Sequence, residues 1–240
     1  ERDGLDACVG VLVTSEFTAR RLEAYGVGSE RIGVATPGVD PVRRAVGPAS
    51  EDEPTLLCVG AVIPRKGQRM LVLALAELTD LPWTCVCTGS LERAPNYSGS
   101  VQALTVQVGL AGRVRFAGEC KAAELDRFYH HASLFVLPSY YEGYGMALAD
   151  ALARGLPVVS TTGGAIPDTV EGDASVLVPP GDVSALAGAL RGLLSGIRGS
   201  ERRAALATAA RSRASRLPDW HQAAIRFASV ALALTPDGNI

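Results

Sequence analysis

Two carboxylates and two glycines surround the expected start of one helix. The stretch SYYEGYGMALADALARGLPVVS (139–160) puts Glu142 just before that helix and Asp150 inside it. The first turn of a helix exposes unpaired N–H groups at a positive dipole end, and Gly143 and Gly145 let a ligand approach the backbone closely. Asp150 lies about 6 Å further along, at about 1.5 Å per residue. This spacing suits a diphosphate on the helix start with a sugar at each end, because carboxylates accept hydrogen bonds from hydroxyls.

The same residues also have a purely structural interpretation. Glu142 could balance the helix dipole near the cap, and Asp150 could be a solvated helix residue. The stretch GYGMAL lacks the third glycine of a Gly-x-Gly-x-x-Gly fingerprint, so a nicotinamide dinucleotide site is not supported. The spacing by itself leaves the ligand site and the structural role open.

A second turn combines glycine with two cations. In GAVIPRKGQ (60–68), Arg65 and Lys66 precede a helical pattern, and exposed amides beside fixed cations can bind an anion such as phosphate. The order Lys-Gly differs from the Gly-Lys-[Ser/Thr] of a P-loop. Two basic residues in a loop can equally well be solvated.

Strands and helices alternate from about residue 54 onward and would position both turns. Apolar runs predict strands at 55–60, 83–88, 113–118, 133–138, 157–160 and 175–180. Helical patterns predict helices at 68–78, 101–109, 121–132, 146–155, 183–195 and 201–216. Apolar strands that alternate with helices are typical of an α/β fold with a doubly wound parallel sheet. Ligands of such sheets bind beyond the carboxyl ends of the strands, where both turns lie.

The two ends of the chain do not fit that alternation. Residues 1–40 read as strand, capped helix and strand, and residues 41–53 as a polar linker. Residues 218–240 read as a helix with Asp219 as its N-cap. We expect both ends to belong to a second domain that is largely absent. Because the chain begins with Glu1, we also expect a piece of a longer product or a processed start.

Composition excludes several function classes. With a net charge of −2, the chain has no global attraction for nucleic acid or an anionic membrane, and no apolar run approaches the length that spans a bilayer. The five cysteines include no Cys-x-x-Cys, and we interpret them as small buried hydrophobes in a reducing cytoplasm. The three histidines show no metal-ligand spacing, so we expect no metal site.

Several segments, in order, resemble one enzyme family. The segment YEGYGMALADALARGLPVVSTTGGAIPDTV, with seven residues between Glu142 and Asp150, resembles the donor site of retaining GT-B glycosyltransferases of the family numbered four. The segments VGAVIPRKG, RIGVATPGVD, DASVLVPPGD and LPDWHQAA resemble other parts of the same family. The resemblance implies a Rossmann-like donor-binding domain over 54–217, the C-terminal half of a GT-B fold. It also implies that 1–40 is a remnant of the N-terminal acceptor domain and that 218–240 is a helix crossing back to it.

The resemblance also implies roles for individual residues. Glu142 would act at the transferred sugar as the catalytic-site carboxylate, Asp150 would bind the nucleotide ribose, and residues 119–121 would lie near the base. The remaining donor-binding residues would be Arg65 and Lys66 on the diphosphate, the amides of Met146 and Ala147 beside them, and the backbone of Gly143, Tyr144 and Gly145 on the sugar. The family uses no bound metal or other cofactor, and its donors are nucleotide sugars such as a UDP- or GDP-hexose. Anomeric configuration would be retained.

Two positions depart from the family pattern. Ala61 stands where an arginine is usual, and Asp150 replaces a glutamate and is about 1.5 Å shorter. The first hypothesis is a bacterial, cytoplasmic hexosyltransferase with an unidentified acceptor, which could be a glycan, a lipid or a small molecule. The alternative is a non-catalytic sugar-nucleotide-binding subunit. We expect this chain alone to transfer nothing. Its terminal segments would offer surfaces for homodimer formation, and the missing domain could contact a membrane peripherally.

Overall fold

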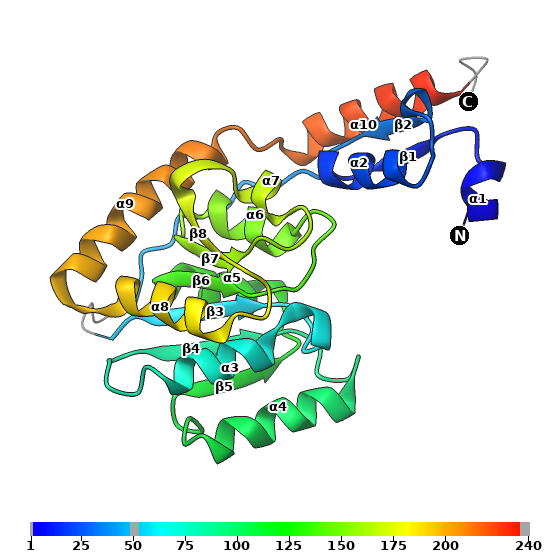
Figure 1. Cartoon of the computed structure of the whole chain (residues 1–240). Coiled ribbons are helices and arrows are strands. Elements are labelled where there is room, and N and C mark those ends of the chain that lie inside the picture. The colour runs from blue at the N-terminus through cyan, green and yellow to red at the C-terminus, as the bar shows by residue number, and fades with distance from the viewer. Residues whose placement is uncertain (1, 49–52, 236–240) are drawn as a thin grey trace.

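The computed structural model describes residues 2–48 and 53–235, which form two sheets of unequal size (Figure 1). The larger sheet has six parallel strands in the order β5-β4-β3-β6-β7-β8. They are β3 (Thr55–Val59), β4 (Thr84–Thr88), β5 (Val114–Gly118), β6 (Leu134–Leu137), β7 (Val158–Thr161) and β8 (Ser175–Val178). Each lies within about two residues of its predicted bounds, so the predicted α/β parallel sheet is confirmed.

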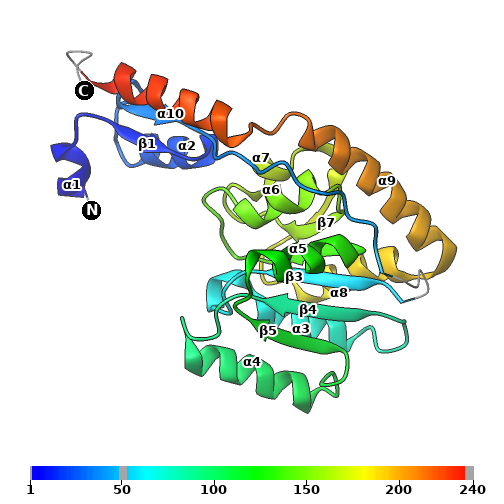
Figure 2. The same cartoon turned by 180° about the vertical axis from the view of Figure 1, so that it is seen from behind.

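Helices cover both faces of this sheet. Figure 1 shows α3 and α8 in front of the strands, and Figure 2 shows α5 in front of them from behind. The helices are α3 (Gln68–Ala76), α4 (Pro95–Gln107), α5 (Ala122–His131), α6 (Met146–Ala153), α7 (Ile166–Val170), α8 (Val183–Leu194) and α9 (Gly196–Ala214), with 3-10 turns at Pro64–Lys66 and Gly172–Ala174. The helix predicted at 101–109 begins earlier, at Pro95, and α7 was not predicted.

The core lies on both faces of the central strands. Every residue of β6 and β7 is buried, and Leu56 of β3 has no exposed surface. Three cysteines, Cys58, Cys85 and Cys87, are also buried there, as predicted. Cys8 is exposed and Cys120 is partly exposed, so the same interpretation is wrong for these two.

The smaller unit combines the two ends of the chain. It contains α1 (Arg2–Ala7), β1 (Val11–Val13), α2 (Glu16–Ala24), a 3-10 turn (Ser29–Arg31), β2 (Ile32–Val34) and α10 (Trp220–Leu234). The strands pair in parallel, and α10 packs against both, which brings the two termini to one side of the molecule (Figures 1 and 2). Asp219 caps α10 in a capping box with Gln222, which confirms the predicted N-cap.

Two connections run side by side between the units. The N–H of Val39 donates to the carbonyl of Pro218 at 2.9 Å, and Val39 and Asp219 form a parallel bridge. The predicted linker at 41–53 falls partly on residues 49–52, which lie outside the described residues, as do residue 1 and residues 236–240. The assignment of 1–40, 41–53, 54–217 and 218–240 to domains stays a prediction.

Candidate functional site

The strand order brings the two turns of interest together. The order in which strands are added to the sheet reverses between β3 and β6, which are hydrogen-bonded parallel neighbours although other strands separate them in sequence. Chain leaving β3 enters the turn at 60–68, and chain leaving β6 enters the loop at 139–145. Both connections therefore meet at the carboxyl edge of the sheet, at the switch point where ligands of doubly wound sheets bind.

Glu142 joins the two connections through its carboxylate. Lys66 Nζ lies 2.6 Å from Oε1, and Arg65 Nη1 lies 3.1 Å from Oε2. The hydroxyl of Ser139 also donates to Oε1, at 2.6 Å. The Glu142 side chain is only 6% exposed, whereas those of Lys66 and Arg65 are 16% and 45% exposed. The residues predicted to hold the diphosphate and the sugar are therefore in direct contact with one another.

These contacts keep Glu142 ionised. Burial raises the pKa of the Glu142 carboxyl, but the hydrogen bonds from Lys66 and Ser139 and the charges of Lys66 and Arg65 outweigh this effect, so the net pKa is below its ordinary value. Glu142 thus does more than balance a helix dipole. It is a buried anion held from the neighbouring turn, and its oxygens accept charge-assisted hydrogen bonds.

The loop between Glu142 and α6 depends on one glycine. Gly145 has φ +96° at the N-cap of α6, and a Cβ there would lie 2.8 Å from Leu148 Cδ1. Across residues 2–48 and 53–235, no hydrogen-bond acceptor is found for the N–H groups of Met146 and Ala147. These N–H groups could therefore donate to an anion at the helix start, and their binding of a diphosphate stays a prediction.

A pocket of about 480 Å³ opens beside this cluster. It lies at the carboxyl ends of β3, β4 and β5 and includes Arg65 and Lys66. Glu119 and Cys120 also line it, from the segment predicted to lie near a nucleotide base. The pocket therefore continues the charged cluster into a space of the size that small ligands occupy.

Ala61, which replaces the usual arginine, lines the same pocket. Its carbonyl accepts a hydrogen bond from Gln68 Nε2 at 3.0 Å. The pocket also contains Arg93, which sequence reasoning missed because it lies in a loop without a motif. Ser139 was missed as well, although a polar residue directly after a buried strand is a signal that could have identified it.

The structure does not bring every predicted residue to the pocket. Asp150 is partly buried in α6 and, like Glu142 and residues 143–147, is absent from the pocket's lining. Burial raises the pKa of the Asp150 carboxyl, and the charge of nearby Arg154 partly opposes that shift. The side chain of Tyr144 is buried in a small cluster with Val39 and Ala149, so its backbone rather than its side chain is available to a ligand. The ribose contact of Asp150 stays a prediction.

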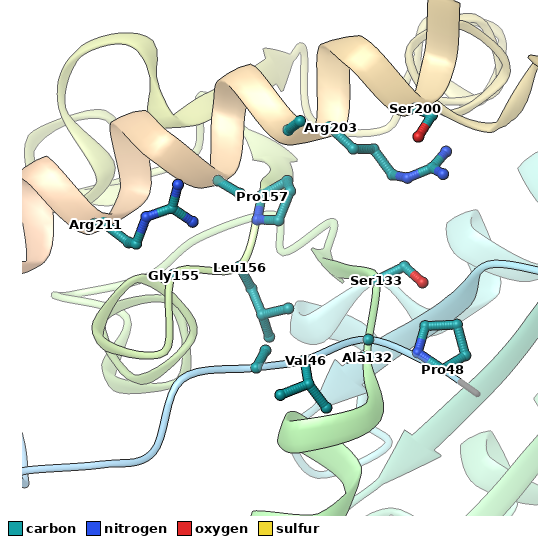
Figure 3. Close-up of a pocket in the computed structure, with 14 residues that line it drawn as sticks. Val46, Pro48, Ala132, Ser133, Gly155, Leu156, Pro157, Ser200, Arg203 and Arg211 are labelled. Atoms are coloured by element: carbon teal, nitrogen blue, oxygen red, sulfur yellow. The ribbon is translucent and has the colours of Figure 1, made fainter. Parts of the chain in front are cut away.

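Another pocket lies at the opposite edge of the sheet (Figure 3). Its volume is about 230 Å³, and Ser133 and Pro157, which precede β6 and β7, line it together with Arg203 and Arg211 of α9. No residue of the Glu142 cluster takes part. A ligand there would meet the amino ends of the strands, away from both turns of interest.

Comparison with known proteins identifies the family. Residues 53–196 match the model of the family described as glycosyl transferases group 1. The chain belongs to this family. It is 31% identical over 248 residues to the GDP-mannose-dependent α-(1-6)-phosphatidylinositol monomannoside mannosyltransferase of Mycolicibacterium smegmatis, with 95% of this chain and 63% of that protein aligned.

Two solved structures have the same fold. Sucrose-phosphate synthase from Thermosynechococcus elongatus matches with a TM-score of 0.81 and 27% identity over 92% of this chain and 57% of that one. Anabaena Alr3699/HepE in complex with UDP and glucose matches with a TM-score of 0.82 and 22% identity over 93% and 63%. The predicted relationship to glycosyltransferases and the predicted Rossmann-like fold are confirmed. The chain spans 63% of the length of its mannosyltransferase relative.

The described residues of this group 1 member include neither a membrane-spanning helix nor a metal-binding cluster. Between residues 2 and 235, apart from 49–52, no helix has the length and apolarity needed to cross a bilayer. In the same residues no group of three His, Cys, Asp or Glu side chains is arranged to hold a metal ion. The predicted cytoplasmic location and the predicted absence of a cofactor remain predictions.

Proposed function

We propose that the protein transfers a hexose from a nucleotide-diphosphate sugar to an acceptor, and that this chain supplies the donor-binding domain. The observation that carries the proposal is the cluster of Lys66, Arg65 and Glu142 at the switch point of the sheet, beside a pocket of about 480 Å³. Two cations and a buried carboxylate are the groups needed to hold a diphosphate and a sugar hydroxyl next to each other.

The cations would bind the diphosphate. Lys66 and Arg65 line the pocket, and the free N–H groups of Met146 and Ala147 would support them from the start of α6. Because both cations are paired with Glu142, an arriving diphosphate would share Lys66 with that carboxylate. The diphosphate charge would then be neutralised by side chains and amides, and we propose that no metal ion is needed.

Glu142 and the backbone of 143–145 would hold the transferred sugar. The carboxylate is ionised, so it can only accept hydrogen bonds, which suits sugar hydroxyls. Asp150 would bind the ribose, either directly or through a water molecule, since it is shorter than the family's usual glutamate. The base would lie in the pocket near Glu119 and Cys120.

We further propose that transfer retains the anomeric configuration. The bond from the anomeric carbon to the leaving phosphate oxygen would break while the acceptor oxygen bonds to the same face of the sugar. The acceptor's proton would pass to the departing phosphate oxygen. In this scheme the protein orients the reactants and stabilises the charge of the leaving diphosphate through Lys66, Arg65 and the helix start.

The acceptor site would lie in the part of the protein that this chain lacks. The chain covers 63% of its mannosyltransferase relative, and the β1–α2–β2 unit with α10 would complete the other domain. The relative's name gives phosphatidylinositol monomannoside as its acceptor, so a lipid acceptor reached by peripheral membrane contact is one candidate here. Glycans and small molecules remain the others.

A non-catalytic, sugar-nucleotide-binding subunit is the second candidate function. It is favoured by Ala61, which removes one pocket cation, and by Asp150, which does not line the pocket. Hydrolysis of a sugar nucleotide by the full-length protein, or transfer to any acceptor, would exclude it.

The test of donor binding is calorimetric titration of this chain. We would titrate UDP, GDP and ADP, followed by UDP-glucose and GDP-mannose. We expect one base to bind in the micromolar range and the others at least about ten-fold more weakly, a difference of about 1.4 kcal/mol. The absence of binding by all five compounds would contradict the proposed donor site.

A further inference from the structure

The loop before α6 has its carbonyl groups held one after another. The carbonyl of Tyr141 accepts from Arg65 Nη1 at 2.6 Å, and that of Glu142 accepts from Ala165 N at 2.8 Å. The carbonyl of Tyr144 accepts from the hydroxyl of Thr169. In a trans peptide the C=O and the following N–H point in opposite directions, so each bond also fixes the direction of the next residue's N–H. These bonds therefore fix the orientation of the N–H groups that would donate to a sugar.

One carbonyl in this series is held from outside the large sheet's unit. The hydroxyl of Ser15 donates to the carbonyl of Gly143 at 2.6 Å, across 128 positions of sequence. Thr18 Oγ1 lies 3.3 Å from the same oxygen and 2.9 Å from Ser15 Oγ. Among the described residues, the carbonyls of 141, 142 and 144 bond only to residues beyond position 60. The smaller unit therefore fixes the orientation of the peptide group between Gly143 and Tyr144.

Ser15 can serve both α2 and the loop at once. Its oxygen accepts the N–H of Thr18 at 3.2 Å as the N-cap of α2, while its single proton goes to Gly143. The residue is 6% exposed, so water does not substitute readily for these bonds. A ring contact also places α2 against the loop: the centroids of the Phe17 and Tyr141 rings lie 5.8 Å apart, edge to face. Arg20 of α2 pairs instead with Asp168 of α7, at 2.9 Å and outside the loop.

We propose that Ser15 is a positioning residue of the donor site, which aims the Tyr144 N–H at the transferred sugar through the Gly143 carbonyl. This inference rests on the proposed function for the identity of the ligand. The inference has a specific consequence. The affinity for the sugar depends on the contact between Ser15 and the Gly143 carbonyl, whereas the affinity for the diphosphate does not. Loss of Ser15 should affect a sugar nucleotide more than the bare nucleoside diphosphate.

Three substitutions separate this role from helix capping. Ser15→Ala removes the cap and the donor, Ser15→Asp keeps a cap but has no proton to give Gly143 at neutral pH, and Ser15→Thr keeps both. We expect Ala and Asp each to weaken binding of UDP-glucose or GDP-mannose by about 3- to 10-fold, the range for one hydrogen bond, with binding of UDP or GDP within about two-fold. Ser15→Thr should bind like the wild type.

The result that would overturn the inference is equally specific. If Ser15→Asp binds the sugar nucleotide as the wild type does, or if all variants weaken the sugar nucleotide and the bare diphosphate equally, Ser15 acts only through the stability of α2. Arg20→Ala serves as the matched control, because it removes a neighbouring contact of the same helix that does not reach the Gly143 carbonyl.

A second measurement does not depend on the ligand. Hydrogen–deuterium exchange of a peptide covering 141–147, followed by mass spectrometry, should be several-fold faster in Ser15→Ala and Ser15→Asp than in the wild type and in Arg20→Ala. Unchanged exchange in both variants overturns the inference, whether or not nucleotides bind. Failure of the wild type to bind any sugar nucleotide would instead overturn the proposed function, and with it the sugar contact.

Discussion

The two sheets of this molecule differ in how many of their strand residues are buried. In the six-stranded sheet, β6 and β7 are buried at every residue. In the two-stranded sheet, β1 and β2 each bury a single residue, and three large apolar side chains of α10 stay half exposed: Trp220 at 48%, Ile225 at 55% and Phe227 at 55%. The large unit has a closed core, whereas the small unit leaves much of its apolar surface exposed.

This difference in burial explains which unit can hold a buried charged group. A closed core can hold a buried charge such as Glu142 in place, because every neighbouring element is fixed. The small unit has no such cluster among its described residues, but an apolar pocket of about 500 Å³ lies between β1, the segment after β2, α10 and Met146 at the start of α6. Its contribution to the Glu142 loop comes through Ser15, the N-cap of α2, and Phe17.

The largest expected effect tests the difference in burial directly. Leu57→Ala in β3 removes a side chain that is 1% exposed and should lower the free energy of unfolding by about 2–5 kcal/mol. Ile225→Ala in α10 removes one that is 55% exposed and should change it by less than about 0.5 kcal/mol. Urea denaturation of both variants measures the contrast, and equal losses would mean that the small unit is as tightly packed as the large one.

An intermediate effect concerns the buried charge of the large unit. Glu142→Gln should lower the free energy of unfolding at pH 7 by about 1.5–3 kcal/mol, the range for hydrogen bonds to charged groups. The folded-state pKa of Glu142 lies below its ordinary value of 4.5, so its contribution is complete above that pH and is lost as the pH falls through the lowered pKa.

The pH dependence of stability therefore separates charge from packing. Denaturation between pH 6 and pH 3 should show a steeper loss of stability in the wild type than in Glu142→Gln. Asp150 acts in the opposite sense, because its raised pKa makes the folded state bind a proton more readily as the pH falls. Parallel curves for the wild type and Glu142→Gln would show that the carboxylate contributes no charge-dependent stability.

The smallest expected effect lies between the units. Arg20 and Asp168 pair at 2.9 Å with side chains that are 59% and 40% exposed, so solvent screens their attraction. Arg20→Ala should change the free energy of unfolding by less than about 1 kcal/mol. A thermal melt with and without 0.5 M salt checks this, and a loss of several kcal/mol would mean that the two units depend on each other far more than their exposed contacts indicate.

Much of the large sheet could be predicted from the sequence because its strands are continuous apolar runs. The run around Leu134–Leu137 has no helical period, and Ser133 and Pro138 mark its ends. The start of α4 at Pro95 was missed because the Asn, Ser and Gly that follow resemble a loop, although proline is common in the first turn of a helix. The short helices α1 and α7 have too few residues to show a period.

The candidate site could be predicted only in parts. Arg65, Lys66 and Glu142 each stood out from their local turns, but their mutual pairing depends on β3 lying beside β6, which no local pattern reveals. The same reason hides the bond from Ser15 to Gly143. The direction of the Tyr144 side chain, away from the loop and toward Val39, depends on packing against the chain connections between the units.

The central claim is that the Lys66 cluster is the diphosphate site, and Lys66→Ala tests it most directly. Calorimetric titration with the nucleoside diphosphate that binds the wild type should show a loss of about 1.5–3 kcal/mol, which is roughly 10- to 150-fold in affinity. Arg191→Ala is the control, because it removes a surface cation paired with Asp80, outside the pocket. Unchanged affinity in Lys66→Ala, or an equal loss in Arg191→Ala, would contradict the account.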